Sequence, residues 1–290
     1  MRDVTPDTLT QAFADYAQGA ADARSRDVFC ALAKHMHAFI REVGLTHAEW
    51  RAGLAALVAA GEITTSARNE FGLFSDLFGV SSLVDMLNSA PGATSSSNMG
   101  PFHRRGAPTL ANGGDLWRDQ VGEPLAVIGR ITDTTGAPIP HVMLDLWQTA
   151  GNGLYAIQDA AQPEMNFHGR LQTAADGGFC FTTVKPMPYT VPDDGPAGLM
   201  LRALARNAWR PSHLHIIAEA PGHIPLVTEI FPTEDPYLDS DAVFGVRADL
   251  LMEYRRGTGR AALPETLLRR DALPEDFWRV DLHLRMAVDG

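Results

Sequence analysis

Apolar residues recur at helical spacing through the N-terminal third of the chain. One face of a predicted helix carries the apolar residues Val28, Leu32, Met36, Phe39, Ile40 and Val43. Gly44 follows as a C-terminal cap, and Thr46 and Glu49 have the spacing of a capping box before the next apolar stretch. A further apolar segment runs over residues 71–87, and the turn-forming residues 89–98 end the helical pattern.

After about residue 120 the apolar pattern changes to the two-residue period of strands. Val142, Leu144 and Leu146 alternate with other residue types, as in a strand with two different faces. A turn at residues 175–178, between Leu171 and the pair Phe179 and Phe181, predicts a β-hairpin. Further strands are predicted over residues 214–218, 226–231 and 280–286. Short strands separated by glycine and proline favour a sandwich or a barrel.

The two patterns together predict an α+β protein with two regions. Residues 1–104 form a helical N-terminal region, and residues 105–290 form an antiparallel β-sandwich. No internal repeat interrupts either region, so each pattern predicts one structural unit.

Composition excludes several classes of protein. The 290 residues include 24 lysines and arginines against 35 aspartates and glutamates, a net charge of −11 that disfavours a nucleic-acid binder. The apolar run Leu54–Ala60 is far shorter than the ~20 residues of a membrane-spanning helix. No apolar leader follows the N-terminus, and Cys30 and Cys180 are too few for a disulfide framework. We therefore expect a cytoplasmic protein that does not enter membranes.

Candidate chemistry gathers in the strand region. His213 and His215 lie two residues apart in a predicted strand, so both imidazoles face the same side and can bind one metal ion. An isolated pair of this kind is more often one packed and one solvated histidine. Tyr155 and Tyr189 lie in glycine- and proline-rich segments of the same region, and Arg210 lies just before the histidines. Such tyrosines often only cover a core, so residue types alone leave the metal site open.

Several motifs of the chain resemble the intradiol ring-cleavage dioxygenases. In the strand region these are residues 144–155 (LDLWQTAGNGLY), 184–189 (VKPMPY), 209–215 (WRPSHLH) and 235–245 (DPYLDSDAVFG). In the helical region, residues 70–80 (EFGLFSDLFGV) and 100–102 (GPF) are similar to linker and pocket segments of that family. The resemblance covers nearly the whole chain. Within the family it looks most like the hydroxyquinol 1,2-dioxygenases, with catechol and chlorocatechol enzymes as neighbours.

The resemblance implies a ferric iron site with one Fe(III) per subunit. Tyr155, Tyr189, His213 and His215 match the family's four iron ligands. Two anionic phenolates and two neutral imidazoles suit the ferric state, and an open coordination position suits a catalytic metal. Tyr189 matches the ligand that leaves the iron and takes a substrate proton. Arg210 matches the cation that stabilises negative charge on the ring.

The resemblance also implies a set of substrate-binding positions. These are Leu73, Asp76, Asn98, Met99, Gly100, Val191, Pro192, Arg210 and Val243. The acidic residue Asp76 resembles what the hydroxyquinol enzymes carry at this position. Hydroxyquinol has one more ring hydroxyl than catechol, and this hydroxyl needs a hydrogen-bond acceptor. The alternative is that Asp76 only caps or solvates its helix.

Two positions depart from the family's pattern. Glu229 stands where many relatives carry a neutral glutamine, so it is expected to be protonated, to pair with Arg210 or to alter the hydrogen bonds around the iron. Asn98 and Met99 replace a more usual aliphatic pair, which predicts a more polar pocket wall. Neither change touches an expected ligand.

The predicted function is cleavage of hydroxyquinol between adjacent hydroxyls with both atoms of O2, giving 3-hydroxy-cis,cis-muconate or maleylacetate. The alternatives are a catechol or chlorocatechol 1,2-dioxygenase and, from another class, a non-enzymatic β-sandwich binding module. The resemblance further implies a homodimer through the helical region, with a phospholipid in an apolar tunnel at its interface.

Overall fold

The computed structural model describes residues 3–65, 68–116, 122–257 and 259–289. The chain divides into two compact units, Met1–Ala59 and Ala60–Gly290. Its α-helices are α1 Leu9–Tyr16, α2 Ala23–Val43, α3 His47–Ile63, α4 Glu70–Leu77, α5 Val80–Asn88 and α6 Pro196–Ala203. The expected domain boundary after residue 104 stays a prediction.

Local capping sets the limits of the N-terminal helices as predicted. Gly44 ends α2 in the left-handed conformation, with φ of 61°. The capping box before α3 is confirmed, because the Thr46 amide donates to Glu49 Oε2 at 2.9 Å and the Glu49 amide donates to Thr46 Oγ1 at 3.3 Å. No side chain of α1 or α2, both fully described, is buried in the single chain.

The apolar segment over residues 71–87 forms two helices rather than one. Gly79 separates α4 from α5 with φ of +71°, a conformation that favours glycine. A Cβ atom at Gly79 would also lie 3.3 Å from the ring of Phe244. The periodicity of the apolar residues continues across this break, so the sequence pattern did not reveal it.

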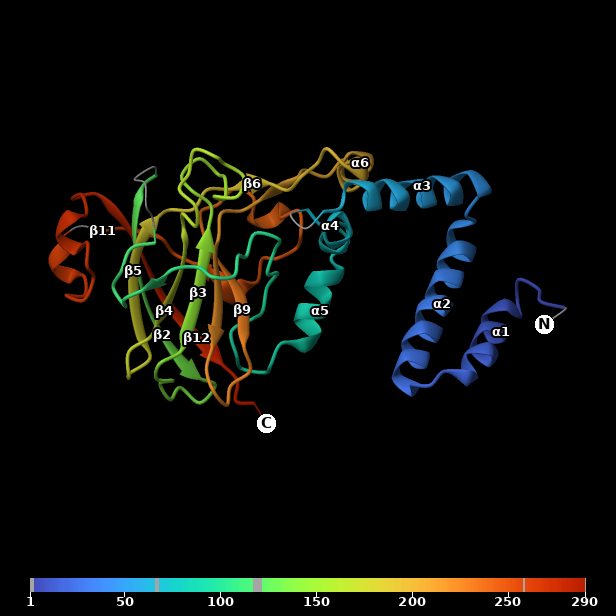
Figure 1. Ribbon diagram of the computed structural model, residues 1–290, viewed down its shortest axis with the longest axis horizontal. Coiled ribbons are helices and arrows are strands. Elements are labelled where there is room, and N and C mark those ends of the chain that lie inside the picture. Colours follow the sequence, from blue (N-terminus) through green and yellow to red (C-terminus); the bar gives the residue numbers. More distant parts are fainter. Residues whose placement is uncertain (1–2, 66–67, 117–121, 258, 290) are drawn as a thin grey trace. The chain divides into compact units, whose positions relative to one another are not determined.

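The C-terminal unit contains two large sheets that pack face to face (Figure 1). In the described residues, one sheet has the order β1-β4-β3-β8-β9-β10, the other has the order β11-β12-β2-β5, and β6 pairs only with β7. The strands are β1 Thr109–Leu110, β2 Pro124–Asp133, β3 Met143–Gln148, β4 His168–Gln172, β5 Gly178–Val184, β6 Tyr189–Thr190, β7 Trp209–Arg210, β8 Leu214–Glu219, β9 Leu226–Pro232, β10 Leu251–Met252, β11 Arg255–Gly257 and β12 Phe277–Met286. The α+β class is confirmed.

Most strand pairs are antiparallel, but each large sheet also contains at least one parallel pair. The long strands β2 and β12 run parallel, and so do β1 with β4 and β9 with β10. Leu144 and Leu146 of β3 are fully buried in the core between the sheets, as their alternation predicted. The antiparallel partners of β3 are β4 and β8. The strand β8, which contains His215, therefore lies at the centre of its sheet.

The predicted hairpin is wrong. The turn exists, because the Gly177 amide donates to the Ala174 carbonyl at 3.0 Å. However, β4 pairs with β3 and β1, whereas β5 pairs with β2 in the opposite sheet. Leu171, Phe179 and Phe181 all pack into the core between the sheets, so the alternation identified their buried faces but not their partners.

Helices of the described residues are all too short or too polar to span a bilayer.

Candidate metal centre and substrate cavity

The two histidines of the H-x-H motif point their Nε2 atoms at each other. His213 lies directly before β8 and His215 lies within it, and both are almost completely buried. The His213 Nδ1–H donates to the Pro211 carbonyl at 2.7 Å, which leaves the Nε2 atom of the neutral ring as an acceptor. This Nε2 atom lies 3.1 Å from His215 Nε2. The ring of His215 is stacked on Trp147, with centroids 4.4 Å apart.

Both predicted tyrosine ligands lie beside this pair. The hydroxyl of Tyr155, from the loop after β3, lies 3.4 Å from His213 Nε2. The ring of Tyr155 stacks on Phe102 at 4.3 Å and packs edge-on against Tyr189 at 5.3 Å between centroids. Tyr189 lies on β6, opposite Arg210 of β7. The structure therefore brings all four predicted ligands, from three segments of the chain, into one buried cluster.

Burial favours the uncharged form of all four predicted ligands. Burial raises the pKa of Tyr155 well above its ordinary value of 10, and burial also raises the pKa of Tyr189. Burial, together with the charge of Arg210, lowers the pKa of His213 to about 4, and burial lowers the pKa of His215. Both imidazoles are therefore neutral donors, and both phenols need a cation to ionise. Two such phenolates with two imidazoles fit a ferric ion.

The buried neutral histidines predict that the metal-free protein loses stability in mild acid. The pKa of His213 is lowered from 6.5 to about 4, so the unfolded chain binds more protons between these values and is favoured as the pH falls. From pH 7 to pH 5 we expect His213 alone to remove about 2 kcal/mol of unfolding free energy. Urea unfolding of the chelator-treated protein at both pH values measures this loss. A metal-free His213→Gln variant with the same loss would contradict the assignment to His213.

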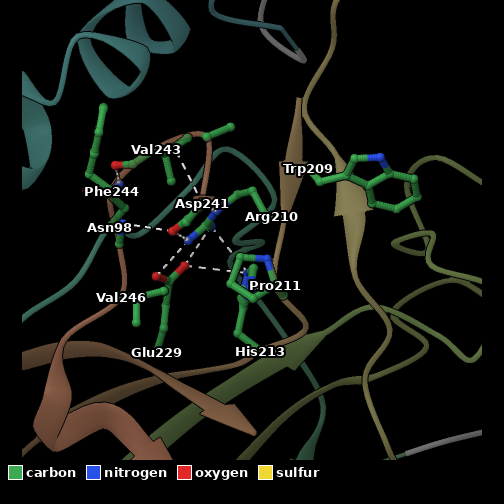
Figure 2. Close-up of polar contacts among 12 residues, drawn as sticks. Asn98, Trp209, Arg210, Pro211, His213, Glu229, Asp241, Val243, Phe244 and Val246 are labelled. Carbon is green, nitrogen blue, oxygen red and sulfur yellow. Dashed lines mark hydrogen bonds and ion pairs between the residues drawn. The ribbon is translucent and has the colours of Figure 1, made fainter. Parts of the chain in front are cut away.

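The Arg210 guanidinium is held between two carboxylates beside His213 (Figure 2). Arg210 donates to Glu229 through Nη1 at 2.8 Å and Nη2 at 2.9 Å, and its Nε donates to Asp241 at 3.1 Å. Arg210 Nη1 also lies 3.3 Å from His213 Nε2. Burial raises the pKa of Glu229, but Arg210 and the two histidines lower it more, so the carboxyl is ionised. Of the three expectations for Glu229, pairing with Arg210 is confirmed.

A cavity of about 720 Å³ opens beside this cluster. All of the positions predicted to bind substrate line it, namely Leu73, Asp76, Asn98, Met99, Gly100, Val191, Pro192, Arg210 and Val243. Of the four predicted ligands, all of which the structure describes, Tyr189 lines the cavity and Tyr155, His213 and His215 do not. Asp76 is half-buried in the wall and hydrogen-bonds Ser81, and burial raises the pKa of Asp76.

Sequence reasoning missed several residues of the site. Ser97 donates to Glu229 Oε2 at 2.6 Å, although it had been part only of a predicted loop. Asp241 lay within a family motif without a role of its own. Trp147 was only one of the residues that alternate with the apolar face of a predicted strand. The β3–β8 pairing sets Trp147 opposite His215, so a correct strand alignment would have revealed this stacking partner.

Residues 22–95 match the protein family described as Catechol dioxygenase N terminus, and residues 100–272 match the one described as Dioxygenase. A 6-chlorohydroxyquinol 1,2-dioxygenase of Cupriavidus pinatubonensis is 40% identical over 260 residues, which cover 89% of this chain and 94% of that protein. A hydroxyquinol 1,2-dioxygenase of Nocardioides simplex is 42% identical over 84% of each chain. The chain belongs to the intradiol ring-cleavage dioxygenases.

Solved structures agree with this assignment. A hydroxyquinol 1,2-dioxygenase from Pseudomonas putida superimposes with a TM-score of 0.89 at 36% identity and covers 98% of this chain and 99% of its own. Intradiol dioxygenases are non-heme Fe(III) enzymes, so this chain is an iron enzyme rather than the non-enzymatic binding module considered as an alternative. The family implies an aromatic substrate and O2.

Proposed function

We propose that this intradiol dioxygenase cleaves hydroxyquinol, and that Asp76 selects this substrate. The observation that carries the proposal is the placement of one half-buried carboxylate in the same cavity wall as Tyr189 and Arg210. Two relatives at about 40% identity carry hydroxyquinol in their names, which supports the same substrate class. Sequence identity at this level does not determine which substituents the substrate ring carries. The residues that line the cavity are therefore the basis for the choice of substrate.

The ligand set is part of the proposal. Tyr155, Tyr189, His213 and His215 would hold one iron per chain, because they gather in one buried cluster. Bound there, iron would supply Lewis-acid activation of the aromatic diol toward O2. Of these four residues, Tyr189 is the one that lines the cavity where the substrate would bind.

The chain's own residues would handle the protons and the charge. Tyr189 Oη, at the cavity wall, would take one of the two protons that the adjacent hydroxyls lose. Arg210 is fixed by two carboxylates and lines the same cavity, so its cation would stabilise negative charge on the substrate oxygens without having to reorient. Leu73, Val191 and Val243 would pack against the ring and keep water away.

Asp76 would accept a hydrogen bond from the third hydroxyl of hydroxyquinol. Burial already raises the pKa of this carboxyl, so a lost hydrogen bond at its cavity side is unfavourable. Catechol lacks this hydroxyl and would leave the carboxyl with only its bond to Ser81. A site that hydrogen-bonds a substrate hydroxyl can strongly reject the analogue without it.

Oxygen uptake with hydroxyquinol, catechol and chlorinated catechols, measured side by side, tests the function. We expect the highest kcat/KM for hydroxyquinol. A higher value for catechol or a chlorocatechol would assign the chain to one of those activities and would leave the iron chemistry unaffected.

We expect Asp76→Ala to lower the ratio of kcat/KM for hydroxyquinol over catechol by at least about tenfold, the effect of one lost hydrogen bond to a charged group. Hydroxyquinol turnover should fall, and catechol turnover should stay or improve. Asp85, a second carboxylate of the same cavity, is a matched control, and Asp85→Ala should keep the ratio near that of the wild type. An unchanged ratio in Asp76→Ala would restrict Asp76 to capping or solvating its helix.

We further infer that the chain works as a homodimer through its helical region, with a phospholipid at the interface. The support is a row of apolar side chains on α2 that a single chain leaves exposed, namely Val28, Phe29, Leu32, Met36, Phe39, Ile40 and Val43. A second copy or a lipid chain would cover such a face.

A further inference from the structure

Glu229 contacts both histidines of the metal cluster as well as Arg210. Its carboxylate is fully buried on β9, opposite His215 in the strand register. Glu229 Oε1 lies 3.5 Å from His213 Nε2 and 3.5 Å from His215 Nδ1. This Nδ1 atom has no hydrogen-bond partner, so Glu229 provides the negative charge that faces it. Ser97 fixes the other carboxylate oxygen, Oε2, at 2.6 Å.

Asp241 also pairs with Arg210, but it differs from Glu229 in its other partners. It accepts from Arg210 Nε at 3.1 Å and from the backbone amides of Val243 at 3.3 Å and Gly245 at 2.8 Å. In the described part of the chain, no hydrogen bond or ion pair joins Asp241 to either histidine. The two carboxylates thus share one cation and similar burial, and they differ in their contact with the histidines.

We infer that Glu229 is a positioning residue that acts directly on the two histidine ligands, holding the ring of His215 and favouring ferric over ferrous iron through its buried negative charge. The inference rests on the proposed ligand set. A fixed negative charge near a metal stabilises the higher oxidation state, and it does so strongly where water is excluded. Carboxylates behind histidine ligands also orient the ring and raise its basicity.

Two variants with the same change of charge can separate a direct effect of Glu229 on the histidines from an effect that acts through Arg210. Glu229, Asp241 and Arg210 together carry a net charge of −1, because two carboxylates face one guanidinium. Glu229→Gln and Asp241→Asn each remove one negative charge from this group and nearly preserve the side-chain volume. Only the first removes the charge that faces His213 and His215.

The experiment is a redox titration of the iron-loaded wild type and of both variants, followed by the visible phenolate-to-iron absorption band. Iron content and melting temperature are measured on the same samples. For Glu229→Gln we expect the ferric–ferrous equilibrium to shift toward ferrous by about tenfold or more, which is about 59 mV in midpoint potential, together with a shifted absorption band. Asp241→Asn should shift the equilibrium clearly less.

Equal shifts in the two variants would overturn the inference, because Glu229 would then act only through Arg210. An unchanged potential in Glu229→Gln would overturn it as well. Glu229→Asp keeps the charge but moves it away from the histidines. It should therefore shift the midpoint potential in the same direction by a smaller amount. This variant provides the test if Glu229→Gln does not fold. A wild type without iron or colour would contradict the proposed ligand set instead.

Discussion

Replacing His215 by alanine is expected to leave the protein without bound iron and without dioxygenase activity. His215 Nε2 lies 3.1 Å from His213 Nε2, so its removal opens the centre of the four-residue cluster. The ring also fills the space against Trp147, and its loss leaves a buried gap. The same outcome is expected for Tyr155→Ala and His213→Ala. Metal analysis after reconstitution with iron, together with the visible spectrum and oxygen uptake, measures it.

A matched histidine provides the control. His223 Nδ1 lies 3.0 Å from the Pro221 carbonyl, in the same Pro-x-His arrangement that His213 makes with Pro211. His223 lies outside the cluster and is partly exposed. The His223→Ala variant should keep iron and activity. A His215→Ala protein that still held one iron per chain and turned over at the wild-type rate would remove His215 from the ligand set.

Features of the fold that depend on neighbouring residues were predictable from the sequence. The capping box of Thr46 and Glu49 and the glycine cap at Gly44 form because each needs only contacts within a few residues. Strand faces were predictable for the same reason, since alternation follows from the geometry of one strand. Strand partners were not. The alternating residues of β4 and β5 face one core from opposite sheets, and nothing local distinguishes that from a hairpin.

The site shows the same division. Alternation placed His213 and His215 on one side of a strand, but only the resemblance to a family joined them to Tyr155 and Tyr189. Neither the alternation pattern nor the resemblance established the ion pairs that Arg210 makes with Glu229 and Asp241. Arg210, Glu229 and Asp241 come from β7, from β9 and from the segment after it, and their pairing depends on how these segments pack. Glu229 was recognised as unusual, yet three states of its carboxyl remained open until the structure placed Arg210 beside it.

Replacing Tyr189 by phenylalanine is expected to lower kcat by at least about 100-fold while part of the iron stays bound. A proton acceptor positioned at the reacting group contributes about 100-fold or more to a rate. Tyr189 is the predicted ligand that lines the cavity, so its Oη is the one that the substrate can reach. Three donors from Tyr155, His213 and His215 remain in the variant. Stopped-flow and steady-state kinetics, normalised to the iron content, measure the effect.

Because kcat is expressed per bound iron, the Tyr189→Phe test distinguishes a loss of proton transfer from a loss of metal. Tyr254 is another buried tyrosine whose pKa burial also raises, and it packs in the core between the sheets. Its hydroxyl lacks a hydrogen-bond partner, so Tyr254→Phe should leave both the iron and kcat nearly unchanged. If Tyr189→Phe kept a normal kcat per iron, another group would have to take the substrate proton. If it instead lost all iron, Tyr189 would be as essential to metal binding as Tyr155. The expected middle result, part of the iron retained and turnover per iron lost, identifies Tyr189 as the base that faces the substrate.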